Sequence, residues 1–174
     1  MKKKILIISY YWPPAGGPGV QRWLKFVKYL PEFNISPVLF VPKNANYPIN
    51  DNSLKSEVSN DLEIIKLPIF ELSNFFPRLK SLNSIRSGNI SKNKNQSILQ
   101  KIIFFIRGNL FIPDMKIFWK RNSVNFLENY ISENNIETIV TTGPPHSLHL
   151  IGLELKRKLN IKWISDFRDP WVNL

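Results

Sequence analysis

The start of the chain constrains its fold most, because it places an apolar strand, a glycine- and proline-rich turn and an amphipathic helix directly after one another. Residues 4–10 are apolar and rich in isoleucine, which is typical of a buried strand. Residues 20–30 carry apolar side chains at helical spacing, and Pro31 ends that pattern. A second apolar run at 36–41 completes a strand–helix–strand unit. This unit predicts a parallel sheet with right-handed crossovers.

The same alternation returns after a polar middle section. Further strands are expected at 62–67, 137–141 and 161–165, and further helices at 98–110, 116–132 and 146–159. The polar stretches 43–60 and 81–97 are predicted to be loops, the second of them a mobile surface loop. The 174 residues therefore predict one Rossmann-like α/β domain, an open parallel sheet with helices on both faces and the strand order 3-2-1-4-5.

Composition limits the possible partners. The chain has no cysteine, which excludes disulfides and thiolate chemistry. A net charge of +11 favours an anionic partner, although a general bias toward Lys, Asn and Ile explains part of it. No recognised nucleic-acid motif is present, so we expect no nucleic-acid partner. The apolar run 5–8 is too short for a signal peptide and no stretch is long enough to cross a bilayer, so the expected location is the cytoplasm.

Three chemically distinctive segments follow strands of the predicted sheet. They are 12–19 after the first strand, 142–147 after the fourth and 166–171 after the fifth. Ligands of open parallel sheets bind beyond the carboxyl ends of the strands, where the strand order reverses. The sequence therefore predicts one cleft lined by all three segments.

The first segment has the residues of a phosphate-binding turn. Gly16, Gly17 and Gly19 allow close backbone approach, and the helix that follows offers N–H groups and a partial positive charge. Arg22 can add a charged contact. A purely structural tight turn is the alternative. Arg22 stands where the dinucleotide fingerprint needs its third glycine, and no P-loop sequence is present, so neither NAD nor P-loop chemistry is expected.

The other two segments supply polar side chains. His146 and Ser147 lie at a predicted helix N-terminus, where they either contact a sugar or acceptor hydroxyl or cap the helix. His149, one turn further on, lies off the predicted core face and is expected to have a surface or supporting role. Asp166 and Asp169 are candidates for a base and a hydroxyl acceptor, and Arg168 either binds substrate or neutralises one of them. Two carboxylates with an arginine between them make a poor site for a hard cation, so no metal is expected.

Three stretches together resemble the N-terminal domain of the family 4 glycosyltransferases, in the bacterial subgroup tied to cell-surface polysaccharide synthesis. The stretches read YYWPPAGGPGVQRWLKFVKYLPEFNISPVLFVP, TTGPPHSLHLIGLELKRK and DFRDPW. The resemblance spans nearly the whole chain and is weakest across 43–100. It implies the GT-B architecture, in which two Rossmann-like domains face each other across a cleft.

The resemblance also implies an activity. Family members transfer a sugar from a nucleotide-diphosphate sugar with retention, and they need no metal or other cofactor. By carry-over, Gly16, Gly17 and Gly19 would line the diphosphate, and His146, Asp166 and Asp169 would face the acceptor and the reacting sugar. The expected partners are a nucleotide sugar and a cell-surface glycan or lipid-linked acceptor.

Two questions stay open: whether the chain is an enzyme domain or a binding module, and whether the segment 98–110 contacts a membrane. The family's paired glutamates and most donor contacts belong to a C-terminal domain that follows this region, so residues 1–174 are expected to be one acceptor-side domain that is inactive alone. A non-catalytic module for a nucleotide or phosphosugar would use the same cleft. The basic, aromatic segment 98–110 is either an ordinary domain helix or a peripheral contact with the anionic inner face of the plasma membrane.

Overall fold

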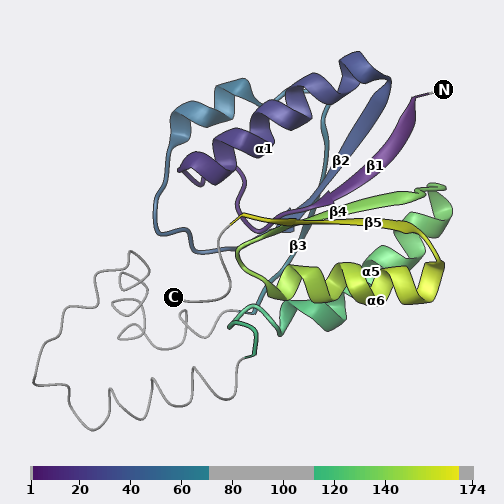
Figure 1. Ribbon diagram of the computed structural model, residues 1–174. Coiled ribbons are helices and arrows are strands. Elements are labelled where there is room, and N and C mark those ends of the chain that lie inside the picture. The colour runs from purple at the N-terminus through teal and green to yellow at the C-terminus, as the bar shows by residue number, and fades with distance from the viewer. Residues whose placement is uncertain (1, 71–111, 169–174) are drawn as a thin grey trace, which may run out of the picture.

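The computed structural model describes residues 2–70 and 112–168 (Figure 1). Five parallel strands form one sheet in the order β3-β2-β1-β4-β5, which confirms the predicted order. Their bounds are β1 Lys3–Ile8, β2 Ile35–Pro42, β3 Glu63–Leu67, β4 Thr138–Gly143 and β5 Lys162–Phe167. Each predicted strand is present, with ends shifted by one or two residues. The chain is therefore a Rossmann-like α/β open sheet.

Helices cover both faces of the sheet (Figure 1). α1 lies on one face, and α5 and α6 lie together on the other. The bounds are α1 Pro18–Tyr29, α5 Trp119–Glu133 and α6 Ser147–Leu159, with 3₁₀ turns η1 at Leu30–Phe33 and η2 at Asn52–Glu57. η2 falls within the stretch 43–60 that was predicted to be a loop. The predicted mobile loop 81–97 and the predicted helix 98–110 lie outside the described residues.

The alternation of side chains along each strand divides the core into two layers. In β1, Leu6 and Ile8 belong to the cluster with α5 and α6, whereas Ile5 and Ile7 belong to the cluster with Trp23 of α1. Leu6, Ile7 and Ile8 are fully buried. A central parallel strand must be apolar on both faces because helices cover both, and this explains the continuous apolar run in the sequence.

Asparagines make the joints between helices and strands at the N-terminal edge of the sheet. Asn34, Asn135 and Asn160 precede β2, β4 and β5 and have φ of 59°, 50° and 51°. Asparagine tolerates this left-handed conformation better than other residues with a Cβ atom. These short joints differ from the longer connections at the opposite edge, where the three segments singled out in the sequence lie.

Candidate functional site at the C-terminal edge of the sheet

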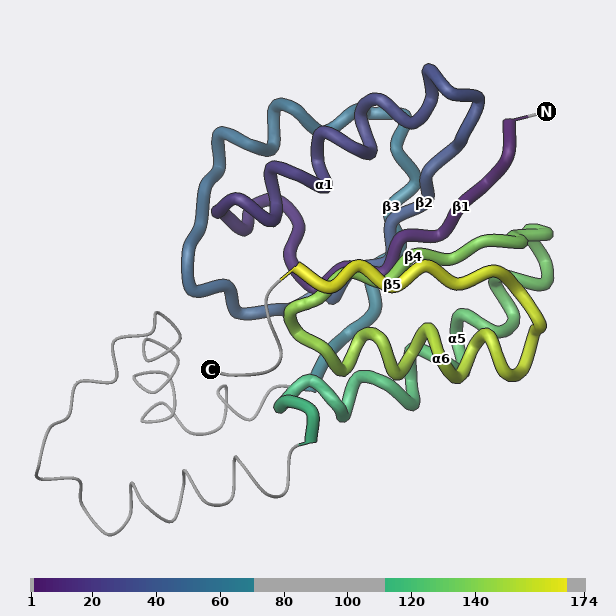
Figure 2. Tube along the Cα trace, in the orientation of Figure 1, coloured from purple at the N-terminus to yellow at the C-terminus, as the bar shows by residue number. Residues whose placement is uncertain are grey.

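The three segments meet at the C-terminal edge of the sheet. Figure 2 shows the turns after β1 and β4 beside the end of β5. The side chain of Arg168 joins them: its Nε donates to the carbonyl oxygen of Gly143 (3.1 Å), and its guanidinium occupies the space that a Cβ on Gly19 would need. The predicted juxtaposition is therefore present for Gly19, Gly143 and Arg168. Asp169 lies outside the described residues.

The glycine turn packs against another loop of the chain at Gly16 and is open at Gly17. Gly16 donates its N–H to Ile49 (2.9 Å), and a Cβ on Gly16 would lie 2.9 Å from the Ile49 side chain. Gly17 is the N-cap of α1, with φ of 107°, and a Cβ there would meet no atom within 4 Å. The close approach at Gly16 is thus to another loop of the protein, whereas Gly17 faces open space.

α1 begins two residues earlier than the sequence predicted. This start reduces the number of backbone N–H groups at the helix N-terminus that are free to bind a ligand. Pro18 is the first residue of the helix and has no N–H. The N–H groups of Val20 and Gln21 both donate to the carbonyl oxygen of Gly17. The backbone therefore offers an anion fewer N–H donors than a helix starting at Val20 would. Binding of an anion at this edge would depend more on charged side chains.

Asp166 is the centre of a network that ties α1 to β4 and β5. Its Oδ2 accepts from the Arg22 guanidinium, from Nε1 of Trp23 (3.0 Å) and from Oγ1 of Thr142 (2.8 Å). Trp23 also donates to Thr142 Oγ1 (2.8 Å). Arg168 was predicted either to bind substrate or to neutralise one of the two aspartates. The ion pair of Asp166 is formed by Arg22 instead, and Asp169 lies outside the described residues. Three elements are thus joined through one carboxylate oxygen.

This network fixes the ionisation of Asp166. Burial opposes the charged form, yet the hydrogen bonds from Arg22, Thr142 and Trp23 outweigh it, so the pKa of the Asp166 carboxyl is lowered. An ionised carboxylate with three donors on one oxygen is a weak proton acceptor near neutral pH. The geometry therefore favours a role in orienting Arg22, whose side chain remains 39 % exposed.

An internal carboxylate caps α6. Asp114 accepts from the Ser147 backbone N–H and from the Ser147 hydroxyl, both at 2.8 Å. A carboxylate at a helix N-terminus is favourable because the helix dipole is positive there. Ser147 is buried, so its observed contact is structural. His146 occupies the N-cap position, but its side chain makes no capping bond within the described part of the chain.

The two histidines face the same glycine. A Cβ on Gly143 would lie 2.8 Å from Nε2 of His149 and 2.9 Å from Nδ1 of His146. Phe167 lies against the His149 ring, with centroids 4.0 Å apart, and is stacked on the His146 ring at 5.8 Å. The Pro-Pro-His turn and the end of β5 therefore form one compact aromatic cluster.

His149 is the residue that the sequence interpretation undervalued. A surface or supporting role was expected, but the side chain is only 5 % exposed and its Nδ1 lies 2.8 Å from Thr141 Oγ1. Burial, reinforced by the nearby His146, lowers the pKa of His149 to about 4. It is therefore a neutral, buried histidine, and the surface interpretation was wrong.

The glycine at the centre of this cluster gives a direct prediction. Gly143→Ala should destabilise the domain by about 1–2 kcal/mol, because the new methyl group must displace two imidazole rings in a packed core. Chemical denaturation measures this. Gly19→Ala is the matched control, since the added methyl there meets only the flexible end of Arg168. Equal stability losses in the two variants would contradict the packing described for Gly143.

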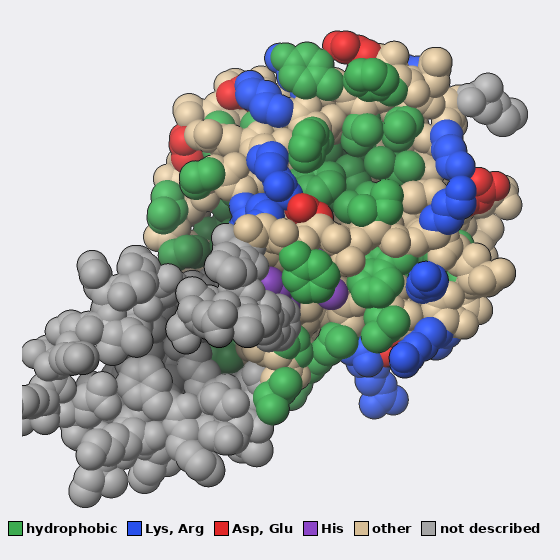
Figure 3. All heavy atoms as spheres, viewed as in Figure 1, with side chains coloured by type: hydrophobic (Ala, Val, Ile, Leu, Met, Phe, Trp, Pro, Cys, Tyr) green, Lys and Arg blue, Asp and Glu red, His purple; other side chains and the backbone are tan. Residues whose placement is uncertain are grey.

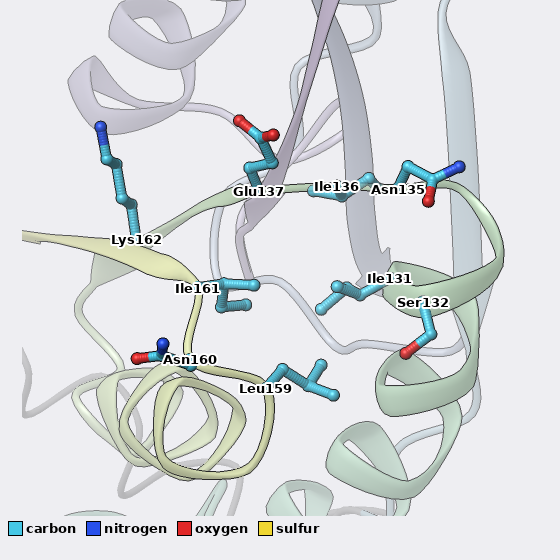
Figure 4. Close-up of a pocket in the computed structure, with 9 residues that line it drawn as sticks. All are labelled: Ile131, Ser132, Asn135, Ile136, Glu137, Leu159, Asn160, Ile161 and Lys162. Atoms are coloured by element: carbon cyan, nitrogen blue, oxygen red, sulfur yellow. The ribbon is translucent and has the colours of Figure 1, made fainter.

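The opposite edge of the sheet carries an open hollow. It has a volume of about 480 Å³ and lies between the ends of α5 and α6 and the starts of β4 and β5 (Figure 4). Asn135, Asn160, Glu137 and Lys162 provide its polar lining. This is the N-terminal edge of a parallel sheet, whereas ligands of this fold bind at the other edge. The hollow is therefore a weaker candidate than the edge that holds Arg168.

Comparison with known proteins places the chain in no family. No family model and no curated protein matches the chain. A hydrogenase C-terminal domain from Pyrococcus furiosus has a TM-score of 0.49 at 11 % identity, with 95 % of this chain and 91 % of that one covered. Apo UGT2 from Phytolacca americana has a TM-score of 0.48 at 14 % identity, with 97 % of this chain and 30 % of that one covered. Likenesses this weak say nothing about the activity of this chain.

Residues 2–70 and 112–168 hold no group of three or more His, Cys, Asp or Glu side chains that could bind a metal ion. No helix in the same ranges is long and apolar enough to cross a membrane.

Proposed function

We propose that the chain is the acceptor-side domain of a retaining glycosyltransferase. In this proposal it transfers a sugar from a nucleotide-diphosphate sugar to a cell-surface glycan or a lipid-linked acceptor, together with a donor-binding domain. The supporting observation is the position of Arg168, which lies between Gly19 at the start of α1 and Gly143 at the end of β4. The sequence motifs of three separate segments thus meet where the fold places its ligands.

The electrostatics of this edge suit a diphosphate. A guanidinium beside the N-terminus of α1 adds a cation to the positive end of the helix dipole, an arrangement that an anion would stabilise. Arg22 is already neutralised by Asp166, whereas no ion pair of Arg168 with an acidic side chain occurs within residues 2–70 and 112–168. Arg168 is therefore our leading candidate for the group that stabilises the departing diphosphate.

The remaining residues take supporting roles in this proposal. Gly17 leaves open space beside the start of α1, so that a phosphate can approach the backbone. His146 is half-buried at the turn after β4 and would bind a sugar or acceptor hydroxyl. Asp166 would hold Arg22 in place. Asp169 would supply the other carboxylate of the predicted pair, as a base or a hydroxyl acceptor.

Calorimetric titration with UDP, GDP and their sugar conjugates tests the proposal. We expect one of these nucleotides to bind, and Arg168→Gln to weaken that binding about tenfold, which corresponds to the loss of one charged hydrogen bond. Arg157→Gln is the matched control, because Arg157 is exposed in the last turn of α6 at the opposite edge. Equal binding by the two variants, or no binding of any nucleotide, would contradict the proposal.

The alternative, a non-catalytic binding module, predicts the same nucleotide binding in this titration. The two functions differ in whether nucleotide diphosphate is released. When a donor-binding domain is supplied, a glycosyltransferase releases free nucleotide diphosphate from its sugar conjugate in the presence of acceptor. A binding module releases none.

A further inference from the structure

A chain of hydrogen bonds decides which nitrogen of His149 carries its proton. Nε1 of Trp163 donates to Thr141 Oγ1 (2.9 Å), and this oxygen lies 2.8 Å from Nδ1 of His149. An indole N–H can only donate, so the Thr141 oxygen is the acceptor in the first bond. Among the described residues the Thr141 side chain has no third partner, so its hydroxyl hydrogen points to Nδ1. Neutral His149 therefore carries its proton on Nε2.

The packing of α6 on β5 holds this chain in place. Gly152 of α6 has no side chain, and a Cβ there would lie 2.3 Å from Nε1 of Trp163. A glycine inside a helix costs stability relative to alanine, so its presence needs a compensating contact. The close approach of the indole ring is that contact. Trp163 and Thr141 are thus positioning residues for the His149 ring.

The Nε2–H of His149 is a buried donor. The side chain is 5 % exposed, and Nε2 has no hydrogen-bond partner within the described ranges. Nearly all buried donors in folded proteins are hydrogen-bonded, so a donor of this kind indicates an acceptor supplied by a ligand. The carboxylates of Asp114 and Asp166 act on His149 only through their charge. Both are already engaged, the first by Ser147 and the second by Arg22.

This donor is directed at the candidate site. A Cβ on Gly143 would lie 2.8 Å from Nε2 of His149, and the carbonyl oxygen of the same glycine accepts from Arg168. A neutral donor and a guanidinium therefore act at one residue, the last of β4. Hydrogen bonds to a charged oxygen are stronger than those to a neutral one, and the Arg168 charge attracts an anion. An anionic oxygen is thus favoured over a hydroxyl as the acceptor.

Phe167 covers this donor. Its ring centroid lies 4.0 Å from that of His149, and the Phe167 side chain is itself 54 % exposed. In Figure 3 little of the histidine side chains is visible, and hydrophobic side chains lie beside them. An exposed side chain changes rotamer rapidly, and turning it toward solvent opens no cavity in the core. A ligand oxygen therefore gains access to Nε2 when the Phe167 ring turns outward.

We propose that His149 is a ligand-binding residue, whose Nε2–H donates to a phosphate oxygen of the bound nucleotide diphosphate. Thr141 and Trp163 hold the imidazole in the tautomer that donates. The inference rests on the proposed function for the identity of the ligand, and it extends the phosphate site from Arg168 and the start of α1 to α6. His149 supplies a hydrogen bond and transfers no proton.

The nitrogen resonances of the histidine ring test the contact directly. In the full chain with isotopically labelled histidine, the free protein should show the His149 proton on Nε2. UDP or GDP, without a sugar, should move this N–H resonance downfield, because a phosphate oxygen is a strong acceptor. A response to the sugar conjugates alone would overturn the phosphate assignment and favour a sugar hydroxyl.

Two indole substitutions test the positioning of His149. Trp163→Phe removes the donor to Thr141, so the Thr141 oxygen can accept from Nδ1–H and part of the His149 population should move its proton to Nδ1. Nucleotide binding should weaken about threefold as the donating tautomer is depleted. Trp119→Phe is the matched control, because the Trp119 N–H has no partner in the described part of the chain. Equal tautomer populations in the two variants would overturn the positioning role.

Affinities separate this inference from the proposed function. Calorimetric titration of His149→Phe should show nucleotide binding weakened about tenfold, by the loss of one hydrogen bond to a charged group. Binding that depends on Arg168 but not on His149, with an unmoved His149 resonance in the unmodified protein, would overturn the inference and leave the proposed function intact. No binding of any nucleotide would overturn both.

Discussion

Asp166→Ala should lower the free energy of unfolding by about 3 kcal/mol. The substitution removes the acceptor shared by Arg22, Trp23 and Thr142 and leaves a half-buried guanidinium without its counter-charge. Equilibrium unfolding in urea measures the loss. Because the pKa of Asp166 is lowered in the folded state, its stabilisation is present above about pH 4 and is lost as the pH falls through the folded pKa.

Glu57→Ala is the matched control for this prediction. Glu57 also pairs with a cation on α1, Lys25, but that pair lies at the surface. An exposed pair of this kind contributes less than about 1 kcal/mol. A loss for Asp166→Ala no larger than that for Glu57→Ala would show that the Asp166 network does not hold α1 against β4 and β5.

Acidification from pH 6.5 to 4 should cost the domain about 3 kcal/mol through His149 alone. The unfolded histidine takes up a proton near pH 6.5, whereas the folded one resists protonation until about pH 4. Over this window the unfolded state binds more protons, so stability falls as the pH falls. Above pH 6.5 both states are neutral at this residue, and its contribution does not change with pH.

His149→Gln separates this effect from other titrations. The amide can keep a hydrogen bond to Thr141 Oγ1 but does not titrate. Urea unfolding between pH 4 and 7 should therefore show a much shallower pH dependence for the variant than for the unmodified protein. Equal slopes would contradict the buried, neutral state of His149. Asp166 does not interfere, because its stabilisation is lost only at lower pH.

The order of the strands was predictable because it follows from local pattern and chirality. Apolar runs such as 36–41 identify buried strands, and right-handed crossovers then leave few ways to arrange them. Ends of elements were less predictable, since helix termini depend on individual contacts. Pro18 begins α1 because proline suits the first helical position, a signal that was present in the sequence but outweighed by the neighbouring glycines.

The meeting of three segments was predictable, but the partners within it were not. Arg168 lies between two glycines because the edge of a parallel sheet gathers the ends of β1, β4 and β5. The pairing of Arg22 with Asp166 spans 144 positions in the chain, and only the packing of α1 on the sheet decides it. The cap that Asp114 gives to α6 and the burial of His149 also depend on tertiary contacts that no local pattern records.

The most direct test of the candidate site is a titration of the isotopically labelled chain with nucleotide diphosphates, followed through its backbone amide resonances. If the segments around Arg168 form one anion-binding edge, the amides of Gly19, Gly143 and Arg168 should shift together with a single dissociation constant. Asn135 and Asn160, at the opposite edge, should stay unchanged. Shifts confined to Asn135 and Asn160, or none with any nucleotide, would contradict a binding site at the C-terminal edge.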